Sequence, residues 1–359
     1  MQENVYVIID TNIWYETLLL NSVTGAAFLY ALNQNNFILV IPEVISLEIN
    51  KHAIKIGSEA ISKIHEGYNI LQRLMGKRDD YRVPTLEELK KRGEDRLSEL
   101  KKLVMSTEFT LKQAKSALLR VIDESPPNRP GNQQFKDSAV WESILEIAQK
   151  GEVHFITKDT GFFQNGKPEN GLAKNLAEEC NKLKNNICIY SDLKNYLTKV
   201  WKELPRIDSK KIGNLINSTI FEEIRKKGVD QDYQLGDLDK IEILPFYTQN
   251  PEVLAIEFQF FYRTKFHESE VFKALVIGNC AFHLGSEAIN DVRIDEMSLI
   301  DPEGYKVRGY AMAWGDITIG RKIIPHKIKH RISDEWIDEP SYYKLKKKEI
   351  KKQKGTSEK

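Results

Sequence analysis

The chain has 359 residues, more than one hydrophobic core usually organises, so we expect two domains. Its 53 Lys and Arg residues are balanced by 52 Asp and Glu residues, and the net charge of +1 excludes a protein that attracts nucleic acid through overall charge. No apolar stretch of the sequence approaches the roughly 20 residues that a membrane-spanning helix needs. Three cysteines without a CxxC pair argue against a disulfide framework and a zinc site, and no secretory leader is apparent, so we expect a cytoplasmic protein.

The first 200 residues alternate short β-branched runs with helical patterns. We predict strands at 4–10, 37–41, 153–157 and 187–191, and helices at 24–34, 42–55, 138–150 and 193–201. A continuous β-branched run between helices is typical of a strand buried on both faces of a parallel sheet. The pattern therefore predicts an α/β domain.

Four acidic residues stand at the ends of these segments. Asp10 follows the first strand, Glu48 lies on the helix that begins at Pro42, Asp137 begins a helix, and Asp159 follows the third strand. In open α/β sheets, ligands bind at the carboxyl ends of the strands. Carboxylates that reach this edge from several segments form an oxygen-rich pocket suited to Mg²⁺ or Mn²⁺.

The order of four short motifs resembles a PIN domain over about residues 4–200. The motifs are Asp10-Thr11-Asn12, the run from Pro42 to Glu48, Lys136-Asp137-Ser138 and Thr157-Lys158-Asp159. The resemblance implies a flavodoxin-like three-layer α/β/α sandwich with a central parallel sheet. It also implies a metal-dependent nuclease that acts mostly on RNA.

The resemblance assigns roles to individual residues. Asp10, Glu48, Asp137 and Asp159 would be the catalytic and metal-binding residues, with Asp10 shared between two metal ions. Thr11, Asn12 and Thr157 would orient carboxylates or water through hydrogen bonds. Lys136 and Lys158 would contact the scissile phosphate, and Arg129 or Asn132 of the preceding loop could approach the site. The seven histidines form no HxH or HExxH pattern, so we expect them on the surface or in the core.

The predicted nuclease domain spans 1–205, with an insertion at about 55–125 between the second and third acids. The spacing of its apolar residues predicts a helical insertion whose two long helices project antiparallel. Residues 206–340 begin with a helix and continue as alternating runs separated by turns. They predict a second, mainly antiparallel β-rich domain that supplies oligomer or partner contacts. Residues 341–359 predict a disordered lysine-rich tail that acts as a solubiliser or attracts phosphate.

The leading hypothesis is an endoribonuclease for single-stranded RNA, in the manner of a toxin or a phage-defence effector. The alternatives are a structure-specific DNA nuclease and a non-catalytic RNA-binding or scaffold module. A phosphoacceptor receiver fits the long insertion poorly. No P-loop or GxGxxG follows the first strand, which disfavours a nucleotide-hydrolysing or dinucleotide-binding protein.

Overall fold

The structure is a computed structural model in two compact units. It describes residues 4–76, 82–100, 104–128, 131, 134–230, 233–266, 272–302, 306–311, 318–319, 329–332 and 335–338. Arg129, Asn132 and the lysine-rich tail lie outside these residues. The first unit comprises Met1–Gly213, Ile241–Gln259 and His283–Ser286, and the second comprises Asn214–Lys240, Phe260–Phe282 and Glu287–Lys359. The domain limits expected from the sequence stay predictions.

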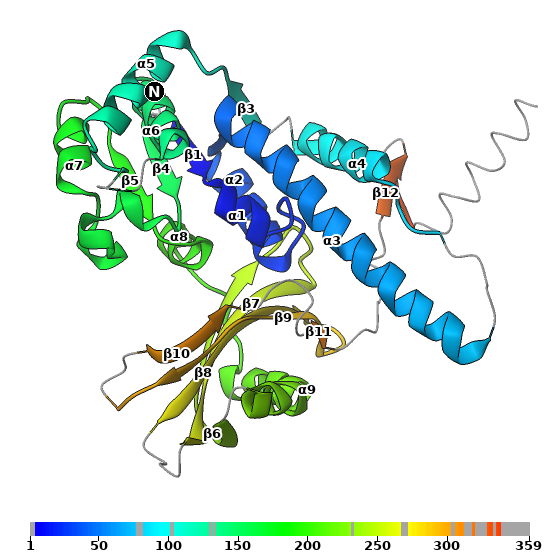
Figure 1. The fold of residues 1–359 in the computed structure, drawn as a ribbon. Coiled ribbons are helices and arrows are strands. Elements are labelled where there is room, and N and C mark those ends of the chain that lie inside the picture. Colours follow the sequence, from blue (N-terminus) through cyan, green and yellow to red (C-terminus); the bar gives the residue numbers. More distant parts are fainter. Residues whose placement is uncertain are drawn as a thin grey trace, which may run out of the picture. The chain divides into compact units, whose positions relative to one another are not determined.

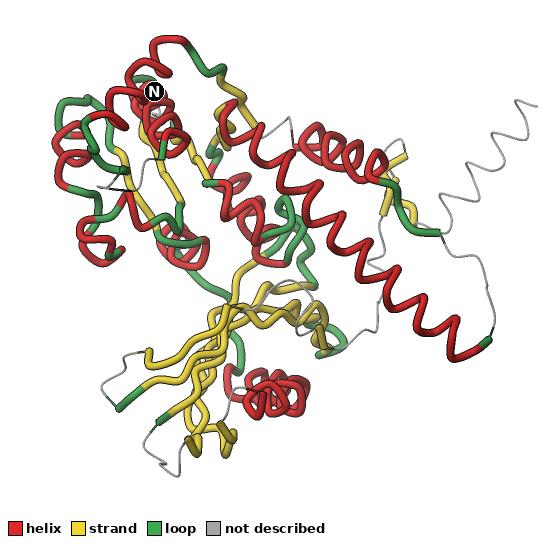
Figure 2. Tube along the Cα trace, in the orientation of Figure 1, coloured by secondary structure: helices red, strands yellow, loops and turns green. Residues whose placement is uncertain are grey.

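A parallel sheet of five strands forms the centre of the first unit (Figures 1 and 2). Its order is β3-β2-β1-β4-β5. The strands are β1 (Val5–Ile9), β2 (Ile38–Pro42), β3 (Val104–Thr107), β4 (Glu152–Ile156) and β5 (Ile187–Tyr190). In the central strand β1, Val7, Ile8 and Ile9 are fully buried, which explains its continuous β-branched run. The predicted parallel α/β sandwich is confirmed.

Helices pack against the sheet and against each other in the first unit. They are α1 (Thr11–Glu16), α2 (Val23–Asn35), α5 (Leu111–Ile122), α6 (Phe135–Ala148), α7 (Lys174–Cys180) and α8 (Leu193–Val200). Within this set α5 contacts α6, while α2 contacts α8. Large side chains fill the core between the layers, and Trp14, Phe28, Trp141, Phe155 and Tyr196 are almost fully buried.

The sequence predicted a wholly helical insertion, and the structure shows that this prediction was wrong for residues 104–107. Residues 104–107 form the edge strand β3, which pairs with β2 in register from Leu39 with Val104 to Pro42 with Thr107. The helix α5 that follows packs on α6 and so belongs to the sandwich. Strand β3 has only four residues and is half-exposed, so its sequence lacks the apolar run that marks a buried strand. Its pairing with β2 decides its conformation.

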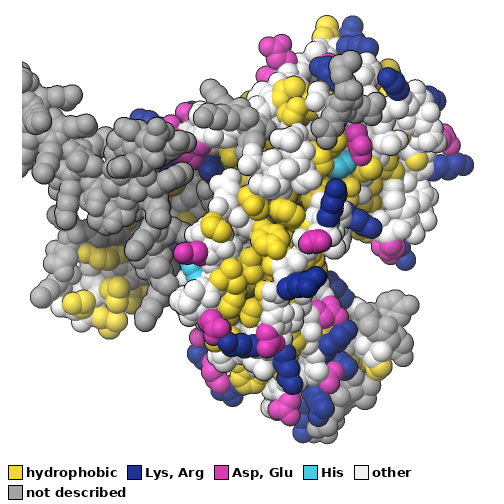
Figure 3. Space-filling view, turned by 180° about the vertical axis from the view of Figure 1, so that it is seen from behind, with side chains coloured by type: hydrophobic (Ala, Val, Ile, Leu, Met, Phe, Trp, Pro, Cys, Tyr) yellow, Lys and Arg dark blue, Asp and Glu magenta, His cyan; other side chains and the backbone are white. Residues whose placement is uncertain are grey.

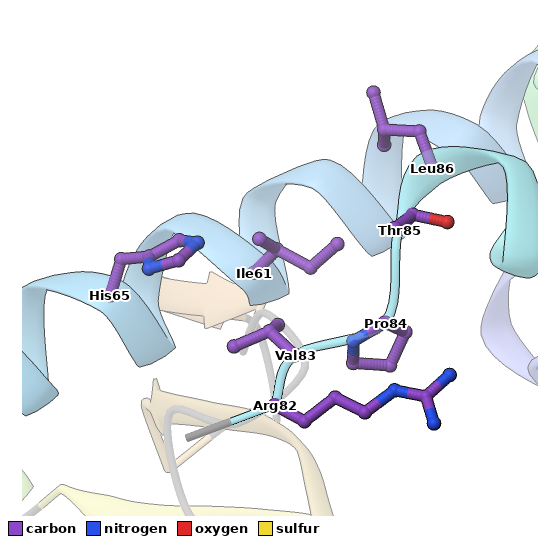
Figure 4. A pocket seen from close by; sticks show the side chains of 7 residues that line it. All are labelled: Ile61, His65, Arg82, Val83, Pro84, Thr85 and Leu86. Atoms are coloured by element: carbon purple, nitrogen blue, oxygen red, sulfur yellow. The ribbon is translucent and has the colours of Figure 1, made fainter. Parts of the chain in front are cut away.

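Two helices that pack along each other form the first part of the insertion, and the first of them continues the helix that was predicted to end at residue 55. Helix α3 (Glu43–Met75) is one helix of 33 residues and ends at Gly76, whose φ of 65° is left-handed. Helix α4 (Leu86–Glu99) begins with a capping box between Thr85 and Glu88 and packs along α3. An open cavity of about 650 Å³ lies between α3 and the segment before α4 (Figure 4). Its lining residues are Ile61, His65, Arg82, Val83, Pro84, Thr85 and Leu86. No carboxylate is among these described residues, so the cavity is separate from the acids.

The C-terminal region is mainly antiparallel, as predicted. It contains α9 (Ser209–Asp230), β6 (Tyr233–Tyr247), β7 (Val253–Phe266), β8 (Lys273–His283), β9 (Ala288–Ile300), β10 (Lys306–Ala311), β11 (Thr318–Ile319), β12 (Lys329–Ile332) and β13 (Glu335–Asp338). The main sheet has the order β10-β9-β8-β7-β6, with β11 on β9, and β12 pairs with β13.

Part of β6 and β7 belongs to the first unit. Phe246 and Ala255 are buried in its core, and the Thr24 hydroxyl donates to Glu257 over 2.5 Å. Across the described residues, no helix combines the length and apolar character needed to cross a membrane.

Candidate active site

Asp10 lies where β1 ends and α1 begins, and its side chain is held by three donors. Its carboxylate accepts from the Thr11 N–H at 2.7 Å, from Asn12 Nδ2 at 2.9 Å and from Thr157 Oγ1 at 2.6 Å. The Asp10 N–H donates to the Ile156 carbonyl at 2.9 Å, which fixes the backbone beside β4. Asp10 is only 8% exposed, so these contacts fix a buried carboxylate in one orientation.

Glu48 reaches the same edge from α3. Its Oε2 accepts from Thr11 Oγ1 at 2.9 Å, and Oε1 pairs with Lys136 Nζ. Thr11 therefore contacts Asp10 through its N–H and Glu48 through its hydroxyl. The Glu48 side chain is 19% exposed, whereas Lys136 is 67% exposed and meets solvent.

Asp137 and Asp159 complete the cluster. Asp137 lies in the first turn of α6, and its carboxyl is close enough to that of Asp159 for the two to affect each other's charge. Asp159 accepts from the Gly161 N–H at 2.6 Å, and its own N–H donates to Thr157 Oγ1 at 2.9 Å. Thr157 thus links Asp10 to Asp159. The structure brings all four predicted acids together, while their catalytic roles stay predictions.

The electrostatics of the site show carboxylates confined together. Burial raises the pKa of Asp10 to about 6 against the hydrogen bonds from Thr157 and Thr11. Burial also raises the pKa of Asp137 to about 8, and the charges of Asp159 and Asp10 add to this rise. Groups with strongly perturbed pKa values in a shared site are typical of functional centres.

A divalent cation fits this set of donors. Within the described part of the chain, Asp137 Oδ2 is buried and has no hydrogen-bond partner. A buried carboxylate oxygen without a donor is costly unless a cation meets it. The four acids supply only oxygen atoms, the ligands that Mg²⁺ and Mn²⁺ prefer. Asp10, Glu48, Asp137 and Asp159 are therefore the residues that would hold such an ion.

The two predicted phosphate contacts have acidic partners in the structure. Lys136 pairs with Glu48, and this hydrogen bond raises the pKa of Lys136. Lys158 pairs with Glu16 on α1, with 2.6 Å between Nζ and Oε1. Both lysines are substantially exposed, so a phosphate could exchange for either carboxylate. Their part in substrate binding stays a prediction.

Two residues that support the acids escaped the sequence analysis. Asn128 is buried, donates to Ser138 Oγ at 2.8 Å and accepts from the Gln134 N–H at 2.6 Å, which fixes the start of α6. Gly161 has the Pro127 carbonyl 2.5 Å from where a Cβ would lie, so a side chain there would displace the loop. The sequence Pro126-Pro127-Asn128 before α6 could have predicted a tight turn at this place.

A second group of potential metal ligands lies on β4 and β5. The ligand atoms of Glu152, His154 and Cys188 all lie within 4.8 Å of one another. His154 Nε2 is 3.0 Å from Glu152 Oε1, and the rings of Tyr190 and Tyr196 pack edge-on against the imidazole. The histidine is buried, as expected for a core residue, and this packing accounts for it. Phe162 and Phe163, after Asp159, are also buried.

Comparison with known families gives one match. Residues 7–162 match the family described as PIN domain, a segment that contains all four acids. Neither the curated proteins nor the solved structures gave a match. PIN domains are generally nucleases that use divalent metals. The predicted resemblance is confirmed, because residues 7–162 of this chain match the PIN domain family.

Proposed function

We propose that this PIN domain is a divalent-metal-dependent endoribonuclease that cleaves single-stranded RNA. The observation that supports the proposal is the convergence of four carboxylates at the carboxyl edge of the sheet. Only Lys136, on the solvent side, pairs directly with one of them among the described residues. Repelling carboxylates destabilise a fold, so a scaffold protein would gain nothing from this arrangement.

The residues of the chain prepare the site before substrate arrives. Asn12 and Thr157 hold Asp10 Oδ2, while Thr157 also fixes the backbone of Asp159. Pre-set carboxylates need little rearrangement to bind an ion, which favours catalysis. A bound divalent ion would supply a nucleophilic water at neutral pH and stabilise the leaving oxygen. Exchange of Lys136 from Glu48 to a phosphate would place a positive charge beside the scissile bond.

Substrate attraction would be local. On the face shown in Figure 3, Lys and Arg side chains are interspersed with Asp and Glu, and the residues described there form no continuous basic surface. This agrees with the net charge of +1. We therefore expect binding to depend on contacts near the acids more than on overall charge. The choice of RNA as substrate follows from the resemblance to PIN domains.

The decisive experiment incubates purified protein with labelled single-stranded RNA and DNA in Mn²⁺, in Mg²⁺ and in EDTA. We expect RNA cleavage in either metal, none in EDTA and none by Asp10→Asn. Cleavage of branched or flapped DNA in preference to RNA would favour the DNA nuclease alternative. RNA binding without cleavage in any metal would favour the non-catalytic module.

The proposed physiological role is that of a toxin-like or phage-defence effector. The support is the β-rich second unit, which offers a surface for assembly or sensing. We propose that this unit carries a homo-oligomer or partner contact. Light scattering of the purified chain tests whether it forms a homo-oligomer. A monomeric mass at all concentrations would exclude the homo-oligomer and favour contact with a different protein.

A further inference from the structure

A cavity of about 220 Å³ lies between α1, α3 and α4 in the first unit. Trp14, Ile49, Ile56 and Leu89 give it apolar walls. Tyr15 and His52 also line it, with ring centroids 6.0 Å apart and planes at 78°. Tyr15 is 38% exposed, so this aromatic pair is open to solvent.

The cavity lies beside the acidic site and shares Thr11 with it. Thr11 lines it and contacts both Asp10 and Glu48. Ile49, the next residue of α3 after Glu48, is another wall. A strand of nucleic acid with its phosphate at the acids would therefore bring a neighbouring base to the cavity.

The lining also has the chemistry of a nucleotide site. Its fifteen described residues include Arg92, Arg96 and His52, and none of the fifteen is acidic. Arg92 pairs with Glu99, but its side chain is 64% exposed, and exposed ion pairs are weak enough to exchange for phosphate. Aromatic side chains stack on bases of any sequence, and the Asn21 amide can pair with a base edge.

One wall of the cavity is held in an unusual conformation. Leu18 and Leu19, which line the cavity, and the following Leu20 have left-handed φ angles of 48°, 59° and 61°. Arg96 donates to the carbonyls of Leu19 at 3.3 Å and Leu20 at 3.1 Å. Helix α4 therefore fixes the loop that closes the cavity, so the projection shapes this part of the site.

We propose that this cavity receives one nucleobase of the substrate strand, beside the scissile phosphate. The inference rests on the proposed nuclease function and extends it, because it gives the insertion a part in substrate recognition. The occupant is a planar base attached to a phosphate backbone, since apolar walls, an aromatic pair and cationic side chains occur together.

Gly93 allows the cavity to be filled without touching the acids. A Cβ at Gly93 would meet only Leu19 Cδ1, at 3.9 Å, and Gly93 lines the cavity. Gly93→Leu should therefore place a side chain inside it, and leucine favours the helix over glycine. Gly67→Leu is the matched control, because a Cβ there meets nothing within 4 Å and Gly67 is not in the lining. Tyr15→Leu is a second test that keeps apolar volume and removes the ring.

The test measures the binding of short single-stranded RNAs that carry 2-aminopurine at successive positions. In wild type and Gly67→Leu, we expect the fluorescence at one position to change on binding. Gly93→Leu and Tyr15→Leu should lose this change and about tenfold in affinity, consistent with loss of one stacked base. Melting temperatures measured on the same samples identify any variant that fails to fold, and the other then decides.

Cleavage measured in parallel separates the two proposals. A position-specific fluorescence change that Gly93→Leu abolishes, without cleavage by wild type, would sink the nuclease function and support the cavity as a base site. Cleavage with equal fluorescence and affinity in all four proteins would overturn the base site alone. The cavity would then suit another occupant, such as an apolar peptide side chain.

Discussion

The first unit holds two clusters of buried or half-buried charges that differ in how the charges are paired. In the first, Arg120 donates to Glu142 at 2.6 Å and to Glu179 at 2.8 and 2.5 Å, and Trp141 Nε1 donates to Glu179 at 3.0 Å. In the second, the four acids of the candidate site face one another. The first cluster pairs its charges within the chain, whereas in the second only Glu48 has a cationic partner among the described residues. The contrast separates carboxylates that hold the fold from carboxylates that would act.

The largest expected effect is the loss of activity on changing Asp10 in the acidic cluster. Asp10→Asn keeps the shape of the side chain and removes its charge, so we expect RNA cleavage to fall about a thousandfold or more with the fold intact. Single-turnover cleavage in Mn²⁺ measures this, with circular dichroism as the check on folding. Cleavage within a few-fold of wild type would remove Asp10 from the mechanism.

Breaking the cluster around Arg120 should lower the stability of the fold. Arg120 is 13% exposed and its partners are 14% and 26% exposed, so Arg120→Met leaves two carboxylates uncompensated. We expect a loss of about 3–5 kcal/mol in the free energy of unfolding, measured by urea denaturation. Arg225→Met is the matched control, because its pair with Glu222 is 53% and 65% exposed and should be worth under about 1 kcal/mol. Similar losses in both variants would contradict the comparison.

A bound metal ion should neutralise the charges of the four acids and so stabilise the folded protein. An ion that binds only the folded protein adds about 2.7 kcal/mol at a hundred times its Kd. We expect Mn²⁺ to raise the melting temperature of wild type, and Asp137→Asn to remove most of this rise. The test is thermal unfolding across a Mn²⁺ titration with an EDTA control. A response that survives Asp137→Asn would place the ion elsewhere.

The smallest effect concerns the metal-free protein. The pKa of Asp137 is raised to about 8 in the folded state, well above the value near 3.9 expected when unfolded. The folded state therefore binds more protons between these values, and stability should fall as pH rises through that window. Asp137→Asn should remove the part of this dependence that comes from Asp137 and add about 1–2 kcal/mol at pH 7, after allowance for its interaction with Asp159. Unfolding in EDTA from pH 4 to 8 tests it. A less stable Asp137→Asn would indicate a structural role.

The sequence predicted the features that depend on local pattern. The buried run of β1 could be recognised because burial on both faces leaves every position apolar. Asp10 and Asp159 could be placed because the ends of parallel strands meet at one edge of the sheet, whereas Glu48 and Asp137, on helices, were placed by the order of the motifs. Strand β3 could not, because an edge strand of four residues owes its conformation to its neighbour β2.

Tertiary pairing also escaped the sequence. Lys136 with Glu48 and Lys158 with Glu16 join residues 88 and 142 positions apart, and no local spacing connects them. The burial of Asn128 likewise depends on the close approach of its loop to α6.

The single helix α3 has a mechanical consequence. Glu48 is near its start and Met75 is at its end, about 40 Å away at 1.5 Å per residue. Its sequence contains no proline to kink it, and α4 runs alongside as a brace. The helix is therefore a stiff rod that carries one of the four acids, Glu48, near its first residue. A partner that bound the far end of α3 and tilted the helix by a few degrees would move Glu48 relative to Asp10. The distance between these two carboxylates would then change, and metal binding at the candidate site depends on it.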